Sequence, residues 1–308
     1  MTSKTFLYIL KRLLLALFTI FLVITITFFA MNAIPGGPFM SEKAVSEETL
    51  ARLNAKYGLD KPLFEQYINY LKNVLRLDFG PSLKSKGRMV SEIILEGLSV
   101  SAKLGLIAAL VAIVFGIFFG TIAAVFRDKW IDRVIMILTT GSVAMPSFVI
   151  GTLLLIIFCL YIPIFPSIGS EPGGLVLPVV SLALYPTSYI TRLTRSSMLD
   201  VLGQDFIRTA RAKGVSRAKV IFKHTLRNSL IPVITYIGPM IAYIITGSLV
   251  VEQIFSVPGL GRAFTSSIIN RDYMLIMGTT ILLATLIIVM NLVSDIMYKI
   301  IDPRVDLG

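Results

Sequence analysis

The sequence has few of the residues from which most active sites are built. Its 308 residues include one cysteine, Cys159, and one histidine, His224, and charged types make up only 15% of the chain. One of each is too few for an internal disulfide, a His/Cys metal site or a Ser/His/Asp triad. The sequence also lacks the Gly-x-x-x-x-Gly-Lys-Ser/Thr phosphate loop. These absences argue against a soluble enzyme and against nucleotide binding by this chain alone.

Apolar residues, by contrast, make up 55% of the chain and gather in long runs without charge. A helix needs about 20 apolar residues to cross the hydrocarbon core of a bilayer. Six charge-free windows hold a mainly apolar stretch of that length, and they are 13–41, 104–126, 134–170, 172–191, 228–251 and 273–294. Pro163 and Pro166 are expected to end the third span near Tyr161. The sequence therefore predicts an all-α polytopic membrane protein with six transmembrane helices.

The distribution of Lys and Arg predicts the orientation of the chain. With six spans both ends lie on one side, and the segments on that side hold seventeen basic residues, against two in the short loops opposite. Basic residues collect in cytoplasmic loops, so we expect both termini in the cytoplasm. The net charge of +11 thus reports topology rather than nucleic-acid binding.

Three regions follow from this topology. Residues 1–31 form the cytoplasmic N-terminus and first transmembrane helix, and residues 32–99 form an external region. Residues 100–308 form a five-helix core with a cytoplasmic loop at 192–229. In the external region, the acidic pair Glu47 and Glu48 before apolar residues at helical spacing predicts a small helical cap, a candidate docking surface.

The predicted spans contain no Asp, Glu or His, the residues that usually couple proton or sodium gradients to transport. This argues against ion-coupled transport. A secondary transporter or passive channel that acts without ATP remains the alternative from another class.

The cytoplasmic loop at 192–229 is the segment most typical of a partner surface. Apolar residues interleave with charged ones between Asp205 and Lys213, which predicts a short amphipathic helix. Gly214 is placed to end it in the left-handed conformation, and Ser216 to cap the next helix. Two interpretations stay open: the basic helix rests on anionic lipid headgroups, or it docks a subunit that binds nucleotide.

Several separated motifs carry a family resemblance. They are Ala-Ile-Pro-Gly-Gly-Pro at 33–38, Leu-Asp-Phe-Gly-Pro-Ser at 77–82, Arg-Thr-Ala-Arg-Ala-Lys-Gly at 208–214, Asn-Ser-Leu-Ile-Pro at 228–232, Glu-Gln-Ile-Phe-Ser-Val-Pro-Gly-Leu-Gly at 252–261 and Asp-Pro-Arg at 302–304. The loop resembles the EAA loop of permease subunits in binding-protein-dependent ABC importers. The whole chain is similar to the oligopeptide/dipeptide (Opp/Dpp) permease family, OppB type. Arg208 replaces the glutamate that begins the loop consensus, so a docking salt bridge through that glutamate is not carried over.

The resemblance implies the type I ABC importer permease fold, with an external helical insertion and a cytoplasmic coupling helix. It implies a location in the inner (plasma) membrane of a bacterium, and uptake of oligopeptides delivered by an external binding protein. The partners would be a second homologous permease (OppC type), two cytoplasmic P-loop ATPases that hold ATP and Mg²⁺, and membrane lipid, without nucleic acid. The chain itself would carry no catalytic residue, cofactor or metal. Related systems import dipeptides, nickel chelates or glycans, so the cargo stays open.

Within this resemblance, the loop helix would couple the permease to the ATPases. We expect Phe206, Ile207, Ala210 and Ala212 to seat it in an ATPase groove, and its basic residues to set the register. The coupling residues are Asp205, Phe206, Ile207, Arg208, Thr209, Ala210, Arg211, Ala212, Lys213 and Gly214.

Residues that interrupt spans three to five are candidates for the translocation path. They are Ser142, Met145, Ser147, Tyr185, Thr235, Tyr236, Tyr243 and Thr246. Hydroxyl and small residues in membrane helices also serve helix packing, which is the alternative for each. The Gly116-x-x-x-Gly120 pair predicts close packing, within this chain or against the sister permease. Between spans five and six, Pro258, Gly259 and Gly261 predict a tight external loop or, alternatively, a gate or binding-protein contact.

Overall fold

The chain folds as two compact units built from helices. The structure is a computed structural model that describes residues 3–35, 37–39, 47–245 and 249–301. One unit comprises Met1–Val100 and Gly259–Ile288, and the other comprises Ser101–Pro258 and Val289–Gly308. In the described ranges no segment is a strand, and an isolated bridge pairs Pro81 with Met89. The helical architecture confirms the predicted all-α class.

The first unit carries the N-terminal helix and two short helices in the region for which the sequence predicts a small helical cap. Its elements are α1 (Ser3–Ala33), α2 (Glu47–Tyr57), α3 (Leu63–Leu75), the first part of α4 (Val90–Val125), α13 (Leu260–Asn270) and most of α14 (Tyr273–Ile301). Glu47 and Glu48 lie in the first turn of α2, where negative charge favours the helix dipole. The Arg52 guanidinium donates to Glu48 at 2.6 Å along the same helix.

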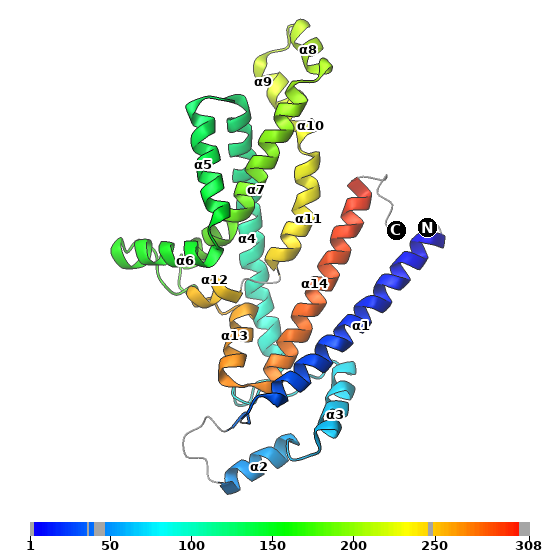
Figure 1. The fold of residues 1–308 in the computed structure, drawn as a ribbon. Helices are drawn as coiled ribbons and strands as arrows, with labels where there is room; N and C mark the ends of the chain where they lie inside the picture. The colour runs from blue at the N-terminus through cyan, green and yellow to red at the C-terminus, as the bar shows by residue number, and fades with distance from the viewer. Residues whose placement is uncertain (1–2, 36, 40–46, 246–248, 302–308) are drawn as a thin grey trace. The chain divides into compact units, whose positions relative to one another are not determined.

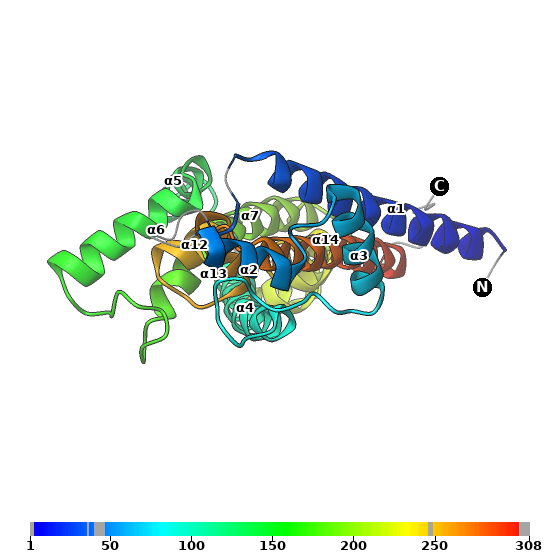
Figure 2. The ribbon, with the colours of Figure 1, turned by 90° about the horizontal axis from the view of Figure 1, so that it is seen from below.

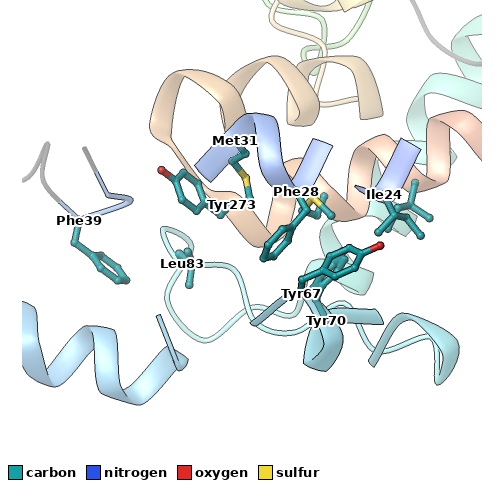
Figure 3. Close-up of a cluster of buried hydrophobic side chains, with 10 residues drawn as sticks. Ile24, Phe28, Met31, Phe39, Tyr67, Tyr70, Leu83 and Tyr273 are labelled. Atoms are coloured by element: carbon teal, nitrogen blue, oxygen red, sulfur yellow. The ribbon is translucent and has the colours of Figure 1, made fainter. Parts of the chain in front are cut away.

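Aromatic side chains form the core of the first unit (Figure 3). The ring of Phe28 on α1 lies 5.4 Å from that of Tyr67 and 6.4 Å from that of Tyr70, both on α3, measured between centroids. The Tyr67 hydroxyl is 2.7 Å from Thr25 Oγ1. Because these rings bridge α1 and α3, apolar burial fastens α3 to the first long helix.

The second unit is arranged around one helix, α7. Its elements are the remainder of α4, α5 (Trp130–Ala144), α6 (Ser147–Leu155), the π-helical η1 (Ile156–Tyr161), α7 (Val176–Leu202), α8 (Asp205–Ala212), α9 (Arg217–Lys219), the π-helical η2 (Val220–Leu226), α10 (Arg227–Ser229), α11 (Ile231–Ile245) and α12 (Leu249–Ile254). Helix α7 contacts α5, α6, α10, α11 and α12. In Figure 1, α8 and α9 lie at one end of α7, and α6 and α12 at the other.

The third predicted span is not one straight helix, which corrects the sequence interpretation. Helices α5 and α6 meet at an angle of 103° across Met145 and Pro146. Figures 1 and 2 show α6 pointing away from α5. Met145 has an extended backbone, as a residue before proline prefers, so the helix stops there. The far end agrees with the prediction, because η1 ends at Tyr161.

Helix length and composition identify fewer spans than six. Three described helical stretches are long and apolar enough to cross a membrane, and they are Leu10–Ala33, Val90–Val125 and Tyr273–Val293. The bent pair of α5 with α6 and η1 would make a fourth as a broken span. The count of six stays a prediction. Helix α4 begins at Val90, so the last ten residues of the region 32–99 belong to the same helix as the second apolar segment.

Candidate functional site

The loop helix α8 forms and ends as the sequence predicts. The acidic Asp205 lies in its first turn and the basic Arg211 in its last turn. The helix dipole favours a negative charge at the start of a helix and a positive charge at its end. Gly214 has a φ of +78°, in the left-handed region. Its N–H donates to the Arg211 carbonyl at 3.0 Å, and the Val215 N–H to the Ala210 carbonyl at 3.2 Å. These two bonds make a Schellman motif, so the glycine closes the helix rigidly.

The two large apolar side chains of α8 face opposite environments. Phe206 is 46% exposed, whereas Ile207 is fully buried within this chain. The structure therefore corrects the expectation that Ile207 enters an ATPase groove, because its side chain instead anchors α8 to its own unit. The cations that flank it, Arg208, Arg211 and Lys213, are exposed.

A second helical segment follows the turn. Ser216 occupies the N-cap position of α9, as predicted, but its side chain makes no capping hydrogen bond. The segment then continues through the π-helical η2 and α10, and α8 packs against η2. The helix, turn and helix are thus one folded piece at the end of α7.

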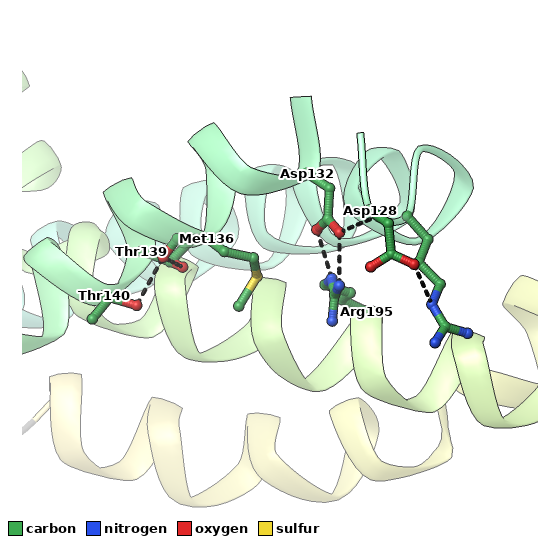
Figure 4. A network of polar contacts seen from close by, with 7 residues as sticks. Asp128, Asp132, Met136, Thr139, Thr140 and Arg195 are labelled. Carbon is green, nitrogen blue, oxygen red and sulfur yellow. Dashed lines mark hydrogen bonds and ion pairs between the residues drawn. The ribbon is translucent and has the colours of Figure 1, made fainter. Parts of the chain in front are cut away.

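A buried ion pair ties α7 to the start of α5 (Figure 4). The Arg195 guanidinium donates to both Asp132 carboxylate oxygens, from Nε at 2.6 Å and from its terminal nitrogen at 2.7 Å. The Asp128 backbone N–H adds a third bond to Asp132 at 2.9 Å. The hydrogen bonds from Arg195 hold the pKa of Asp132 below its ordinary value. Asp132 is 3% exposed and the Arg195 side chain 23% exposed, so the carboxylate is shielded from water more fully than the guanidinium.

The glycine pair in α4 permits close contact with α7. A Cβ atom on Gly116 would lie 2.6 Å from the Ile190 side chain, and one on Gly120 would lie 2.6 Å from Thr194 and 2.7 Å from the Thr191 carbonyl oxygen. No side chain fits at either position without movement. The pair therefore packs helices within this chain, one of the two expected alternatives.

A cavity of about 880 Å³ lies beside the bend between α5 and α6. Five of the eight predicted path residues line it, and they are Met145, Ser147, Tyr185, Tyr236 and Tyr243. The other lining residues are Val143, Ala144, Pro146, Phe148, Leu182, Pro186, Pro239, Met240, Ile244, Leu249 and Val250. None of these sixteen described residues is charged. The cavity wall is thus neutral, with phenol groups as its main polar side chains.

The remaining three path candidates do not line the cavity. Ser142 and Thr235 donate to carbonyls one turn earlier in their own helices, at 2.9 and 3.0 Å, which is the alternative expected for hydroxyl residues in membrane helices. Thr246 lies outside the described residues.

The predicted loop between spans five and six is more helical than expected. Gly259 is the N-cap of α13, and Gly261 lies in the first turn of that helix. Both glycines are buried, and Pro258 is exposed. A binding-protein contact at these three positions would therefore involve Pro258.

Two buried acids were missed by the sequence interpretation. Asp272 accepts hydrogen bonds from the Ser82 hydroxyl and from the Leu83 N–H at 3.1 Å, and it also caps the start of α14 through the Leu275 N–H at 3.2 Å. Glu252 accepts a bond of 2.7 Å from the Ser101 hydroxyl. Each lies directly beside a charge-free window of the sequence, Asp272 before 273–294 and Glu252 after 228–251. An acid at the end of an apolar segment is the signal that could have marked these two residues as buried.

Together, the paired helices around α7, the neutral cavity and the projecting α8 define an integral-membrane transport subunit. Residues 116–307 match the family described as the binding-protein-dependent transport system inner membrane component. Residues 5–88 match its N-terminal counterpart. The chain belongs to this family of permease subunits, which are multi-pass proteins of the bacterial inner membrane.

Curated relatives match along almost the whole chain. The oligopeptide transport system permease protein OppB of Haemophilus influenzae is 45% identical, over 97% of this chain and 98% of the relative. The dipeptide transport system permease protein DppB of Bacillus subtilis is 44% identical over the same shares. OppB of Salmonella typhimurium is 42% identical, again over 97% and 98%.

Solved structures share the fold at much lower identity. An amino acid ABC transporter crystallised with histidines has a TM-score of 0.52 and 17% identity, over 70% of this chain and 95% of the other. The inward-facing MetNI methionine ABC transporter has a TM-score of 0.54 and 16% identity, over 68% and 97%. These two likenesses confirm the predicted permease fold type.

Proposed function

We propose that this chain is a transmembrane permease subunit of an ATP-driven importer that takes up oligopeptides from an external binding protein. The observation that carries the proposal is the 45% identity to a relative named for oligopeptide transport, over nearly the full length of both chains. A relative named for dipeptide transport is 44% identical, so dipeptides are the second candidate cargo.

In this proposal the chain works with separate ATPases. Two cytoplasmic P-loop subunits bind ATP and Mg²⁺, and a second permease of the OppC type completes the pathway. The chain itself contributes no ATPase site and no catalytic residue. The absence of a Gly-Lys dipeptide anywhere in the sequence supports this division of labour. The excess of basic residues in the segments predicted to lie on the same side as the termini supports a cytoplasmic location for both ends.

Helix α8 is the proposed coupling helix. The exposed Phe206 and the cations of α8 meet the ATPase, while the buried Ile207 fixes the helix to its own unit. Only Gly203 and Gln204 separate α8 from α7. A displacement of α8 therefore acts directly on α7, which lines the cavity at Tyr185 and Pro186.

The neutral cavity is the proposed passage for the peptide. A wall without fixed charge suits a cargo whose side chains vary, because an ion pair would select one sequence and slow its release. The convergence of Met145, Ser147 and three tyrosines on one cavity supports this assignment.

Uptake by the assembled transporter tests the proposal. We expect affinity purification from the native membrane to recover a second permease and P-loop ATPases, and cells to take up labelled oligopeptides only when this chain is present. Competition between peptides of two to five residues separates the two cargo classes. Purification without an ATPase, from a preparation that still moves solute in vesicles, would favour the channel or secondary transporter.

Gly214 allows a sharper test of the coupling helix. A Cβ atom added at Gly214 would have no neighbouring atom within 4 Å. A substitution there therefore acts through its effect on the backbone conformation and not through a steric clash. Valine disfavours a φ of +78°, whereas asparagine tolerates it. We expect Gly214→Val to abolish uptake with membrane levels unchanged, and Gly214→Asn to retain it. Full uptake by the valine variant would remove the coupling role.

A further inference from the structure

A second cavity of the same unit lies where α4 and α7 end, beside the turn that follows α8. Its volume is about 450 Å³, within the range of known ligand sites. Ala124 and Val125 are the last two residues of α4, and Leu202 is the last residue of α7. Most of the described lining residues are apolar, and these are Ala124, Val125, Leu202, Val215, Val220 and Ile221. The cavity therefore has an apolar floor at the ends of two long helices.

The two other lining residues are cations, Arg211 of α8 and Arg217 of α9. Arg211 follows Ile207 by four residues, so the two share one face of α8. Ile207 is buried within this unit, so Arg211 lies on the side of α8 that faces its own chain. Arg208 and Lys213 do not line the cavity and stay available to an ATPase.

These two arginines have no acidic partner in the part of the chain that the structure describes. The acid nearest to Arg211 in the sequence, Asp205, pairs instead with Arg208 at 3.6 Å. No described lining residue of the cavity carries a negative charge. Two guanidinium groups without a counter-charge, beside an apolar floor, favour an anion that carries an apolar tail.

The position of the cavity along α4 favours a lipid as this anion. Ala124 and Val125 belong to the charge-free window 104–126, and the next residue is Arg127. The end of such a window marks the boundary of the hydrocarbon core, where the phosphate groups of lipids lie. A phospholipid would cover the apolar floor with an acyl chain, whereas a free phosphate ion would leave it bare.

We propose that this cavity binds an anionic phospholipid. The guanidinium groups of Arg211 and Arg217 contact its phosphate group, and the apolar floor contacts the first part of an acyl chain. The lipid thereby supports α8 from the side on which Ile207 is buried, and leaves the exposed Phe206 to the ATPase. Lipid contact and subunit docking, the two interpretations of the basic loop, are then compatible. The inference goes beyond the proposed function, because it assigns a ligand to a cavity outside the passage.

Photolabelling of the full-length protein, purified with the subunits that accompany it, tests the inference. The probe is a photoactivatable phosphatidylglycerol, present at increasing fractions in phosphatidylcholine nanodiscs, and mass spectrometry identifies the labelled peptides. We expect saturable labelling of the peptides that hold residues 124–125 and 215–221. In Arg217→Gln, the lipid fraction at half-saturation should rise about fivefold, which is the effect of one basic contact with an anionic lipid.

Lys219→Gln is the matched control. It removes the same charge from the same short helix, at a position that does not line the cavity, and should leave half-saturation unchanged. Arg217→Lys keeps the charge and should retain most of the affinity. If Arg217→Gln fails to insert, Arg211→Gln makes the same test from the other side of the cavity.

Four results would overturn the inference. The first is the absence of label from these peptides, and the second is equal labelling by a phosphatidylcholine probe. The third is an equal loss in Arg217→Gln and Lys219→Gln, which would mean that the overall charge of the loop attracts lipid. The fourth is displacement of the label by inorganic phosphate, which would identify a site for the free anion. Labelling needs neither ATP nor peptide, so a failure of uptake would count against the proposed function alone.

Discussion

The two units of the molecule hold their helices together by different means. In the first unit, large aromatic side chains such as Phe28, Tyr67 and Tyr70 fill the space between α1 and α3. In the second, Gly116 and Gly120 have no side chain, so the backbone of α4 lies directly against Ile190, Thr191 and Thr194 of α7. Ring burial and ring contacts hold the first kind of packing, whereas close approach of two helices holds the second. The two units therefore depend on different contacts for the same task.

Truncation of the aromatic core should have the largest effect. Phe28 is 6% exposed and contacts two tyrosine rings, so Phe28→Ala leaves a cavity that the neighbours cannot fill. We expect a loss of about 3–5 kcal/mol in the stability of the first unit. Thermal unfolding of the detergent-purified protein by circular dichroism measures it. Phe18→Ala, on the same helix but 57% exposed, is the control, and equal losses would contradict the assigned core.

Loss of the buried ion pair should come next. Asp132→Asn leaves the Arg195 guanidinium without its counter-charge in a largely buried position, at a cost of about 3 kcal/mol. Asp128→Asn changes an adjacent acid whose carboxylate pairs with the exposed Arg127, and should change stability by less than about 1 kcal/mol. The same unfolding assay compares them.

The pH dependence of this pair has a definite sign. Arg195 lowers the folded-state pKa of Asp132, so the pair stabilises the fold above the ordinary carboxyl pKa of about 4. The stability gap between wild type and Asp132→Asn should be constant from about pH 5 to 8 and shrink as the pH falls below about 4. A gap that widens in acid would contradict the assignment.

A smaller effect is expected for the backbone contact between α4 and α7. In Gly120→Ala the new methyl group would meet Thr194 and the Thr191 carbonyl at under 3 Å, so the helices must separate, at about 2 kcal/mol. Gly141→Ala adds the same methyl group where no atom lies within 4 Å. It should be neutral or slightly stabilising in thermal unfolding. Two similar results would remove the distinction between the units.

The smallest effect should come from a single hydroxyl in the aromatic core. Tyr67→Phe keeps the ring contacts and removes only the 2.7 Å hydrogen bond to Thr25. Thr25 retains its own bond to the Phe21 carbonyl at 2.8 Å, so no buried donor is stranded. We expect a loss of about 1 kcal/mol. A change as large as that of Phe28→Ala would mean that polar contacts, not ring burial, hold this core.

Hydropathy and turn chemistry predicted much of the fold. The helix at α8, its end at Gly214 and the end of η1 near Tyr161 all depend on local signals, which a single sequence displays. The angle between α5 and α6 does not follow from such local signals. Pro146 ends a helix, whereas Pro186 sits inside one, and the difference depends on the packing of neighbours rather than on proline itself.

Long-range partners were beyond the reach of the sequence. The periodicity of α8 marked both Phe206 and Ile207 as apolar but could not say which would be buried in its own chain. Asp272 binds a loop nearly two hundred residues earlier in the chain, and no local pattern records such a pairing. For the cavity, the tyrosines were identifiable because polar groups interrupted apolar runs.

The anchoring of α8 by Ile207 bears on biogenesis. This side chain is buried in its own subunit, and the Gly214 turn is closed by its own hydrogen bonds, so α8 is held in place by contacts within this chain. Under the proposed coupling role, an ATPase would therefore meet a helix that is already formed. The rate of complex formation would then depend on encounter between the subunits rather than on folding of the loop.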